Sequence, residues 1–325
     1  MTILKEKHIE FLTKETQTRN FLYFSTKPLR LATIYWTVCA LKMLKKTDIL
    51  KEKRNEIISY ILSCQNTDKG FGASKDFPST ILSTFNALQI FYILEYLYFD
   101  KKTIKYILSN FDSSDGSFKN DTGGEKDTRF SCCAILSLHL LFLFNKYGKF
   151  VFKKKLNQPI DYKYIKYLEG KGFNVEKFVQ NILNCCNPDG GIGSKPGSES
   201  HAAQIFCCIS SLRSLNLIDI IDLEKVKKFL IFRQTENGGL NGRPNKKEDV
   251  CYSFWVFSSL VMINSDDKID KNSLKEFILT CQSEEGGFSD RKGHEPDIYH
   301  TMFALAGLYL LGNTDLESID PGFCL

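Results

Sequence analysis

Gly238-Gly239-Leu240 is one copy of a short turn that recurs along the chain and decides its fold. The other copies are Lys69-Gly70-Phe71, Gly116-Ser117-Phe118, Gly190-Gly191-Ile192 and Gly286-Gly287-Phe288. The apolar members of successive turns are 47, 74, 48 and 48 residues apart. Self-similarity at a period of about 20 to 50 residues is typical of repeat architectures. The chain is therefore predicted to be an array of similar structural units.

The segments on the two sides of each turn have different hydrophobic patterns. Before a turn, apolar residues follow helical spacing with one face left polar, which indicates an outer helix. One example is the set Ile104, Ile107, Leu108 and Phe111. After a turn, the segments 202–212, 251–263 and 301–311 are apolar nearly all round, which indicates interior helices.

Six outer and inner pairs can be counted if 3–14 and 31–44 form the first pair. We therefore predict an all-α fold, an α6/α6 toroid (α/α barrel) that forms one domain over residues 1–325. Closure of the ring also explains why no polar capping repeat is evident at either end.

The composition excludes several classes of protein. With 325 residues, 43% of them apolar, the chain is neither disordered nor fibrous. The longest apolar run, Phe130–Phe144, is short and interrupted by polar residues, so no membrane span is expected. The charged N-terminal stretch lacks the apolar core of a signal peptide, and a cytoplasmic location is expected. The eleven cysteines include no CxxC motif and are interpreted mainly as buried, reduced thiols.

The net charge of +5 is concentrated in one segment. Residues 145–172 carry eight lysines against Asp161 and Glu169, a net +6, so the remainder carries about −1. This lysine-rich segment lies inside the longest interval between turns and is predicted to be an insertion. Because the positive charge is confined to it and no nucleic-acid-binding module surrounds it, no nucleic-acid partner is expected.

The predicted inner helices begin with acidic residues, namely Asp127, Glu199, Asp249 and Asp297. If the repeats superpose, these helix starts meet at one rim. Free backbone N–H groups at such a rim favour an anion such as a diphosphate. A carboxylate at a helix start also acts as an N-cap, and we interpret Asp127 and Glu199 in this way.

Asp249, Cys251 and His300 form a candidate metal site. Asp249 and Cys251 are two residues apart, and His300 lies 49 residues after Cys251, one repeat period plus one. Neighbouring helix starts would bring the three side chains together. Asp, Cys and His all bind zinc, and three protein ligands leave a fourth position open for catalysis. The alternative is that His300 and Cys251 are simply core residues.

A glycine-hinged basic loop, 239–248, directly precedes this site. Its Arg243 and Lys246 are candidates for holding a diphosphate, and His201 and Tyr252 at neighbouring helix starts could add hydrogen bonds. An ordinary solvated loop is the alternative. Aromatic residues of the inner helices are candidates for lining an apolar hole, and the alternative is that each is simply a core residue. They are Trp36, Phe85, Tyr252, Phe254 and Trp255.

Three segments resemble the β subunits of protein prenyltransferases, namely 124–131, 196–208 and 238–255. The first two are most similar to the Rab geranylgeranyl branch, whereas the third is similar in all branches. The resemblance extends over most of the chain, from about residue 36 to residue 324. It implies a toroid that pairs with a helical-repeat α subunit and encloses a central lipid pocket.

The resemblance also implies roles for individual residues. It assigns Zn²⁺ to Asp249, Cys251 and His300. It assigns the diphosphate, together with Mg²⁺, to His201, Arg243, Lys246 and Tyr252. It assigns the isoprenoid to Arg129 and Trp255, with Trp36 as a further candidate.

Two positions bear on the length of the lipid. The farnesyl branch carries a bulky tryptophan where this chain has Ala32, and a small residue there favours the twenty-carbon geranylgeranyl diphosphate. Phe85 is larger than the residue expected in the Rab branch, and the insertion 145–172 is not typical of that branch. The expected substrates are Rab GTPases with C-terminal cysteines, presented by an escort protein.

Several alternatives to the Rab geranylgeranyl interpretation remain open. Within the class, the chain could be the β subunit of a CaaX prenyltransferase, either farnesyl or geranylgeranyl type I. Asp266-Asp267-Lys268-Ile269-Asp270 matches the DDxxD motif of isoprenyl diphosphate synthases, but it lies in a polar link and is interpreted as coincidental. A glycosidase toroid has no use for a thiolate ligand. A non-catalytic binding scaffold is the alternative from a different class.

Overall fold

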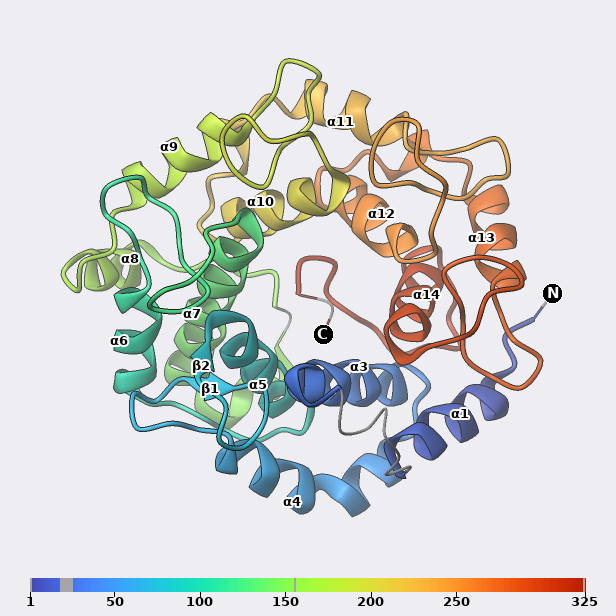
Figure 1. Ribbon diagram of the computed structural model, residues 1–325, viewed down its shortest axis with the longest axis horizontal. Helices are drawn as coiled ribbons and strands as arrows, with labels where there is room; N and C mark the ends of the chain where they lie inside the picture. The colour runs from blue at the N-terminus through green and yellow to red at the C-terminus, as the bar shows by residue number, and fades with distance from the viewer. Residues whose placement is uncertain (1, 18–25, 155, 324) are drawn as a thin grey trace.

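The computed structural model describes residues 2–17, 26–154, 156–323 and 325. Within them, two concentric rings of helices form a toroid, as Figure 1 shows in a view down its axis. The inner ring consists of α3 (Arg30–Met43), α5 (Ile81–Ile93), α7 (Thr128–Tyr147), α10 (Ala202–Ser214), α12 (Tyr252–Met262) and α14 (Ile298–Leu310). The outer ring consists of α1 (Lys5–Gln17), α4 (Thr47–Ser63), α6 (Lys101–Ser109), α9 (Val175–Cys185), α11 (Leu223–Ile231) and α13 (Lys271–Thr280). The prediction of six helix pairs is confirmed.

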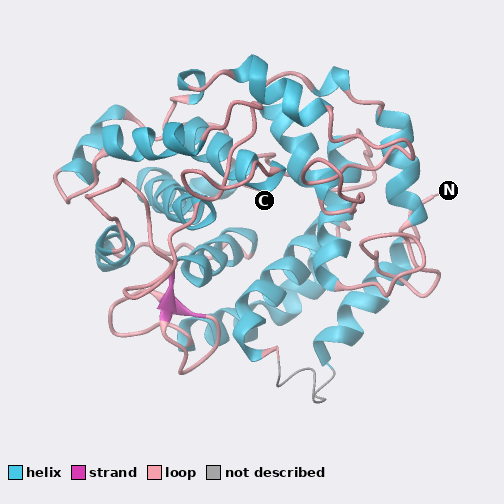
Figure 2. Cartoon of the chain, turned by 45° about the horizontal axis from the view of Figure 1, so that its top comes forward, coloured by secondary structure: helices cyan, strands magenta, loops and turns pink. Residues whose placement is uncertain are grey.

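The remaining elements are short. Strands β1 (Phe71–Gly72) and β2 (Ser79–Thr80) pair antiparallel, with Phe71 opposite Thr80, and are the small magenta feature of Figure 2. The 3-10 helices are η1 (Lys27–Leu29), η2 (Gly148–Lys153), η3 (Ile218–Ile220) and η4 (Asp266–Lys268). Helix α8 (Tyr162–Glu169) lies outside the six pairs.

The ring closes because each inner helix packs against the next, and α14 packs back against α3. The outer helices are amphipathic, whereas the inner helices are buried along nearly their whole length. Thr128–Lys153 is apolar and long enough to cross a bilayer, but 89% of its most apolar window is buried inside the protein. Packing within the ring therefore accounts for its composition.

The recurring turn has a common hydrogen-bond pattern. In the turn between α4 and α5, Oδ1 of Asp68 accepts from the backbone N–H of Gly70 at 2.9 Å and from Ser79 Oγ at 2.8 Å. In the turn between α9 and α10, Oδ1 of Asp189 accepts from the N–H of Gly191 at 2.9 Å and from Ser200 Oγ at 2.7 Å. One side chain thus ties the turn to the residues that lead into the next inner helix.

Glycine is required at position 238 of this turn for two reasons. Gly238 has φ +83°, and a Cβ there would lie 2.5 Å from the backbone oxygen of Ser273 on the next outer helix. Any side chain would therefore be strained and would collide with fixed backbone. The turns consequently allow each outer helix to approach its neighbour closely.

The C-terminal residues close one end of the ring. The carbonyl of Phe323 accepts from Gln89 Nε2 at 3.2 Å, and Arg213 makes two bonds to Asp320 at 2.8 and 3.0 Å. Phe323 and Leu325 are buried. Arg213 lies near the end of α10, so this closure is at the rim opposite the starts of the inner helices.

The lysine-rich segment 145–172 begins in the last turn of α7 and forms η2 and α8. It is packed onto the toroid: the N–H of Ile160 donates to the carbonyl of Ser214 at 2.8 Å, and His139 Nε2 donates to the carbonyl of Gln158 at 2.7 Å. Both contacts lie toward the C-terminal ends of inner helices, at the rim that the C-terminal residues close.

Candidate active site

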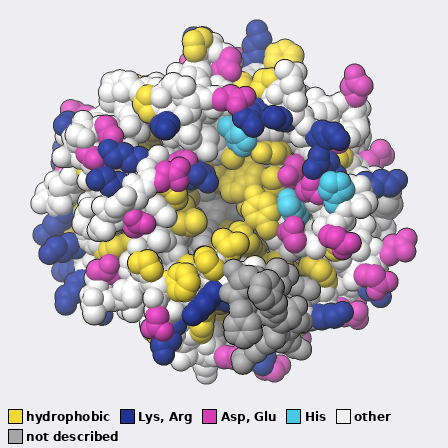
Figure 3. All heavy atoms as spheres, viewed as in Figure 1, with side chains coloured by type: hydrophobic (Ala, Val, Ile, Leu, Met, Phe, Trp, Pro, Cys, Tyr) yellow, Lys and Arg dark blue, Asp and Glu magenta, His cyan; other side chains and the backbone are white. Residues whose placement is uncertain are grey.

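The starts of the inner helices surround a central hollow. Figure 3 shows this face of the molecule, with hydrophobic side chains lining the hollow and charged and histidine side chains around its rim. A site at this rim can therefore present polar groups to the head of a ligand whose apolar part enters the hollow.

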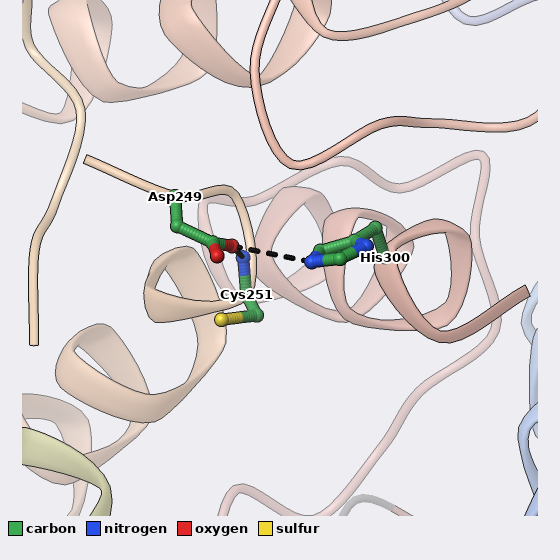
Figure 4. Close-up of side chains that lie close together, drawn as sticks. All are labelled: Asp249, Cys251 and His300. Carbon is green, nitrogen blue, oxygen red and sulfur yellow. Dashed lines mark hydrogen bonds and ion pairs between the residues drawn. The ribbon is translucent and has the colours of Figure 1, made fainter. Parts of the chain in front are cut away.

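Asp249, Cys251 and His300 come together at this rim. One ligand atom from each lies within 4.8 Å of the others. Asp249 Oδ1 accepts from the backbone N–H of Cys251 at 2.8 Å and lies 3.5 Å from His300 Nε2. Figure 4 shows the carboxylate and the imidazole pointing toward each other beside Cys251. The residues come from the loop before α12, the start of α12 and the start of α14, as the repeat spacing predicted.

Asp297 fixes the orientation of the histidine. Its Oδ2 atom lies 2.6 Å from His300 Nδ1, and its Oδ1 atom accepts from the backbone N–H of His300 at 2.8 Å. The first contact leaves Nε2 directed at Asp249. A carboxylate on the outer nitrogen of a histidine is the usual partner of a metal-binding imidazole. Sequence reasoning treated Asp297 only as an acidic helix start, although its spacing of three residues from His300 was visible.

The three groups shift one another's pKa values. Burial raises the pKa of the Cys251 thiol well above its usual value, and the neighbouring Asp249 raises it further. Burial lowers the pKa of His300, but hydrogen bonds to Asp249 and Asp297 outweigh it and raise the pKa to about 9. Burial opposes ionisation of Asp249, yet its bonds to His300 and Cys251 leave its pKa lowered.

Tyr299 is a further residue that sequence reasoning missed. Its ring lies edge-on to His300 at 4.9 Å and to Trp36 at 5.1 Å, and its pKa is raised, first by burial and then by the charge of Cys251. Its position directly before His300 was the only available signal. Tyr299 thus joins the cluster of Asp249, Cys251 and His300 to Trp36.

Three of the four candidate diphosphate residues lie close together. Tyr252 Oη and His201 Nε2 are 3.2 Å apart. His201 Nδ1 accepts from the N–H of Ala203, so the ring proton belongs on Nε2 and is donated to Tyr252. Burial lowers the pKa of His201, and the charge of Arg243 lowers it further. The imidazole is therefore a neutral donor.

Arg243 is held beside this pair by its own loop. The carbonyl of Gly242 accepts from the N–H of Ala202 at 2.8 Å, which ties the loop to the start of α10. The guanidinium of Arg243 forms an ion pair with Glu199. Lys246 is exposed, and among the described residues its ammonium forms no ion pair that would place it with the other three.

The interpretation of Glu199 as an N-cap is wrong. The N-cap of α10 is His201, and the carboxylate of Glu199 instead reaches the guanidinium of the neighbouring loop. The same interpretation is confirmed for Asp127, whose Oδ1 accepts from the N–H of Arg129 at 2.7 Å at the start of α7.

The candidate lipid residues divide into two groups. Trp255 packs against Phe206 at 4.7 Å and Phe303 at 4.5 Å, and Tyr299 joins Phe303 to Trp36. These rings form a continuous aromatic wall. Phe254, which is buried on α12 and contacts Trp255 at 5.4 Å, also belongs to this wall. The second group consists of Ala32 and Phe85, which are buried on α3 and α5, and of Arg129, which pairs with Asp127 at 2.8 Å.

A family model, the prenyltransferase alpha-alpha toroid domain, matches residues 3–325. The chain belongs to this family. The family includes proteins that are similar to the chain over most of its length. The chain is 40% identical over 246 residues to the geranylgeranyl transferase type-2 subunit beta of Saccharomyces cerevisiae, covering 72% of this chain and 66% of that protein. It is 37% identical to the Candida albicans protein of the same name, covering 71% of this chain and 64% of that protein.

Among solved structures, the toroid is similar to Candida albicans protein geranylgeranyltransferase-I complexed with GGPP. The TM-score is 0.79 at 25% identity, and the match covers 99% of this chain and 96% of the other. The chain is also 29% identical to the geranylgeranyl transferase type-1 subunit beta of Arabidopsis thaliana, covering 66% of this chain and 57% of that protein. The chain thus spans a little under two thirds of the length of these curated relatives.

The DDxxD motif has a structural role in this prenyltransferase toroid. Asp266 and Asp267 pair with Lys271 and Lys268, and Asp270 accepts from backbone N–H groups as the N-cap of α13. The motif follows the C-terminal end of α12, so it lies at the rim opposite Asp249. The interpretation of the motif as coincidental agrees with this placement.

Proposed function

We propose that this chain is the catalytic β subunit of a Rab geranylgeranyltransferase, which transfers a geranylgeranyl group from geranylgeranyl diphosphate to C-terminal cysteine thiols of Rab GTPases. The observation that carries the proposal is the cluster of Asp249, Cys251 and His300 at the mouth of an apolar hollow. The 40% identity to a type-2 β subunit favours the Rab branch over CaaX enzymes, since type-1 similarity is 29%.

Asp249, Cys251 and His300 would hold Zn²⁺, because their donor set and spacing fit a three-ligand catalytic site. The ion would supply a fourth coordination position that keeps the protein substrate's thiol ionised at neutral pH. Asp297 holds the imidazole so that Nε2 faces Asp249. No general base is needed in this scheme.

Transfer forms a bond between the substrate sulfur and C1 of the lipid and breaks the bond from C1 to the diphosphate oxygen. The thiol proton goes to solvent, and the diphosphate leaves with the bonding electron pair. The N–H of His201, released from Tyr252, and the hydroxyl of Tyr252 would donate hydrogen bonds to the departing diphosphate, and Arg243 and Lys246 would offset its charge with Mg²⁺. The isoprenoid would lie along the aromatic wall with Arg129 near it, bounded by Ala32 and Phe85.

We further propose that the chain forms one toroidal domain, with residues 145–172 as an insertion, and that it works with a helical α subunit and an escort protein that presents the Rab substrate. A cytoplasmic location fits the ten described cysteines, all of them free. A thiol-dependent transferase of this kind needs a reducing compartment.

The test is Cys251→Ala in the chain co-expressed with its α subunit. Metal content by mass spectrometry and transfer of a labelled twenty-carbon lipid to a Rab tail are measured together. We expect loss of bound zinc and of transfer with the unfolding temperature nearly unchanged. Full zinc content in the variant would contradict the site. Preference for the fifteen-carbon lipid would support a farnesyl enzyme instead, and a metal-free inactive wild type would support a binding scaffold.

A further inference from the structure

The lysine-rich insertion presents a strongly positive surface. Its described lysines are all exposed; they are Lys146, Lys149, Lys153, Lys154, Lys163, Lys166 and Lys171. Its two acidic residues, Asp161 and Glu169, each pair with one lysine. Seven lysines against two carboxylates leave a net +5 on this surface. The positive charge therefore faces outward and is not neutralised within the insertion.

Exposed aromatic rings stand among these lysines. Phe150 and Tyr162 each have 72% of their surface exposed. The ammonium of Lys166 lies 5.3 Å from the centre of the Tyr162 ring. Lysines with exposed aromatic rings are the combination found where proteins lie on membrane interfaces, because the rings enter the head-group region and the ammonium groups meet lipid phosphates.

The exposure of Phe150 does not come from a loose segment. Its neighbour Val151 is fully buried, and Leu156 and Ile160 are 4% and 3% exposed. Tyr92 Oη also donates to the carbonyl of Lys154 at 3.4 Å. The chain on both sides of Phe150 is anchored to the toroid, so the ring is directed outward on a fixed support.

A cationic cavity continues this surface. Phe152 of η2 lines a cavity of about 190 Å³ together with Lys42, Lys51 and Arg54. Glu95 is the single carboxylate among the lining residues. Arg54 is fixed by bonds to the carbonyls of Leu94 at 2.7 Å and Glu95 at 3.1 Å. Three cations in a partly enclosed space can receive a phosphate head group.

We propose that η2, α8 and the adjoining cavity form a docking surface for membranes rich in anionic phospholipid. The charge of the surface is complementary to such a membrane, and a cluster of four to eight basic residues is the usual size of such a determinant. Because η2 follows the C-terminal end of α7, the surface lies toward the rim opposite Asp249. A membrane bound there leaves the mouth of the hollow open to a protein substrate.

The test is co-sedimentation of the full chain, in the assembly in which it is purified, with vesicles at 0.1 M salt. Vesicles of phosphatidylcholine with about 30% phosphatidylserine are compared with vesicles of phosphatidylcholine alone. We expect binding to the anionic vesicles only, weakening as salt is raised. The variant Lys149→Glu/Lys153→Glu should bind roughly 25-fold or more weakly, and Phe150→Ser roughly fivefold.

The matched control is Lys225→Glu/Lys228→Glu on α11, which changes the same charge at two exposed lysines of the outer ring. It should bind like the wild type, and all variants should keep the wild-type unfolding temperature. Equal losses in the control and in the η2 variant would overturn the proposal, as would no binding to anionic vesicles. Binding to polyglutamate without binding to vesicles would assign the surface to an acidic protein and overturn the membrane assignment.

Discussion

The Oδ2 atom of Asp297 lies 2.6 Å from Nδ1 of His300, and Nε2 of the same ring lies 3.5 Å from Oδ1 of Asp249. The carboxylate of Asp297 therefore orients the imidazole so that its Nε2 atom faces the carboxylate of Asp249. Asp297 also accepts from the N–H of His300 and so begins α14. The same residue sets where the helix starts and where the histidine points.

Asp297→Asn should weaken zinc binding by roughly 10- to 100-fold, because an amide keeps the helix cap but removes the charge that holds the imidazole. Competition with a chelator of known affinity measures this directly. The matched control is Asp270→Asn, which alters the N-cap of α13 far from the site. Unchanged zinc affinity in the Asp297 variant would show that the contact has no role in the metal site.

Gly238→Ala should destabilise the protein far more than Gly197→Ala. Both residues have positive φ, +83° and +78°, so both substitutions cost roughly 1 to 2 kcal/mol of backbone strain. A Cβ at Gly238 would also lie 2.5 Å from the backbone oxygen of Ser273, whereas nothing lies within 4 Å of one at Gly197. Denaturant unfolding of both variants measures the difference, and equal losses would mean that α13 shifts to make room.

The repeat made most of the fold predictable. Each glycine turn follows a segment with helical periodicity, and the copies at Gly190 and Gly238 show the same pattern as the others. The meeting of Asp249, Cys251 and His300 was also predictable, since Cys251 and His300 occupy similar places in successive repeats. Glu199 was misinterpreted because its partner, Arg243, comes from the loop of the next repeat, where the local sequence carries no signal.

Contacts between distant segments were not predictable. The bond from Gln89 to the carbonyl of Phe323 spans 234 residues, and no periodicity links them. The fold of residues 145–172 was likewise not predictable, because lysines dominate the hydropathy pattern of this segment and only isolated residues such as Val151 are buried. The position of Lys246 on a basic loop was predictable from the sequence, but the direction of its long exposed side chain was not.

Stability should fall as the pH drops from about 6.5 to about 4. Burial lowers the pKa of His8 to about 4, and burial lowers the pKa of His139 to about 4 as well. Between these pH values the unfolded chain binds protons that the folded chain does not, so acid favours unfolding. Each histidine contributes on the order of 3 kcal/mol across this range.

His8→Gln should flatten this pH dependence by removing one of the two groups. The ring of His8 accepts from the N–H of Gly287 at 2.8 Å and contacts Gln282 at 2.9 Å. The variant therefore also weakens the contact between α1 and the last repeat. The slope of unfolding free energy against pH, and not its absolute value, is therefore the measurement. A slope equal to that of the wild type would show that His8 does not titrate in this range.

Glu199→Gln should tighten the binding of inorganic diphosphate by severalfold. In the free protein the carboxylate of Glu199 forms an ion pair with the guanidinium of Arg243, which lies next to His201 and Tyr252. An anion that binds there must displace this carboxylate, and the amide removes the competing charge. Calorimetric titration with diphosphate measures the change. Glu224→Gln, which breaks the ion pair with Lys227 on α11, should leave the affinity unaltered. Weaker binding in the Glu199 variant would mean that the carboxylate positions Arg243 for the anion and does not compete with it.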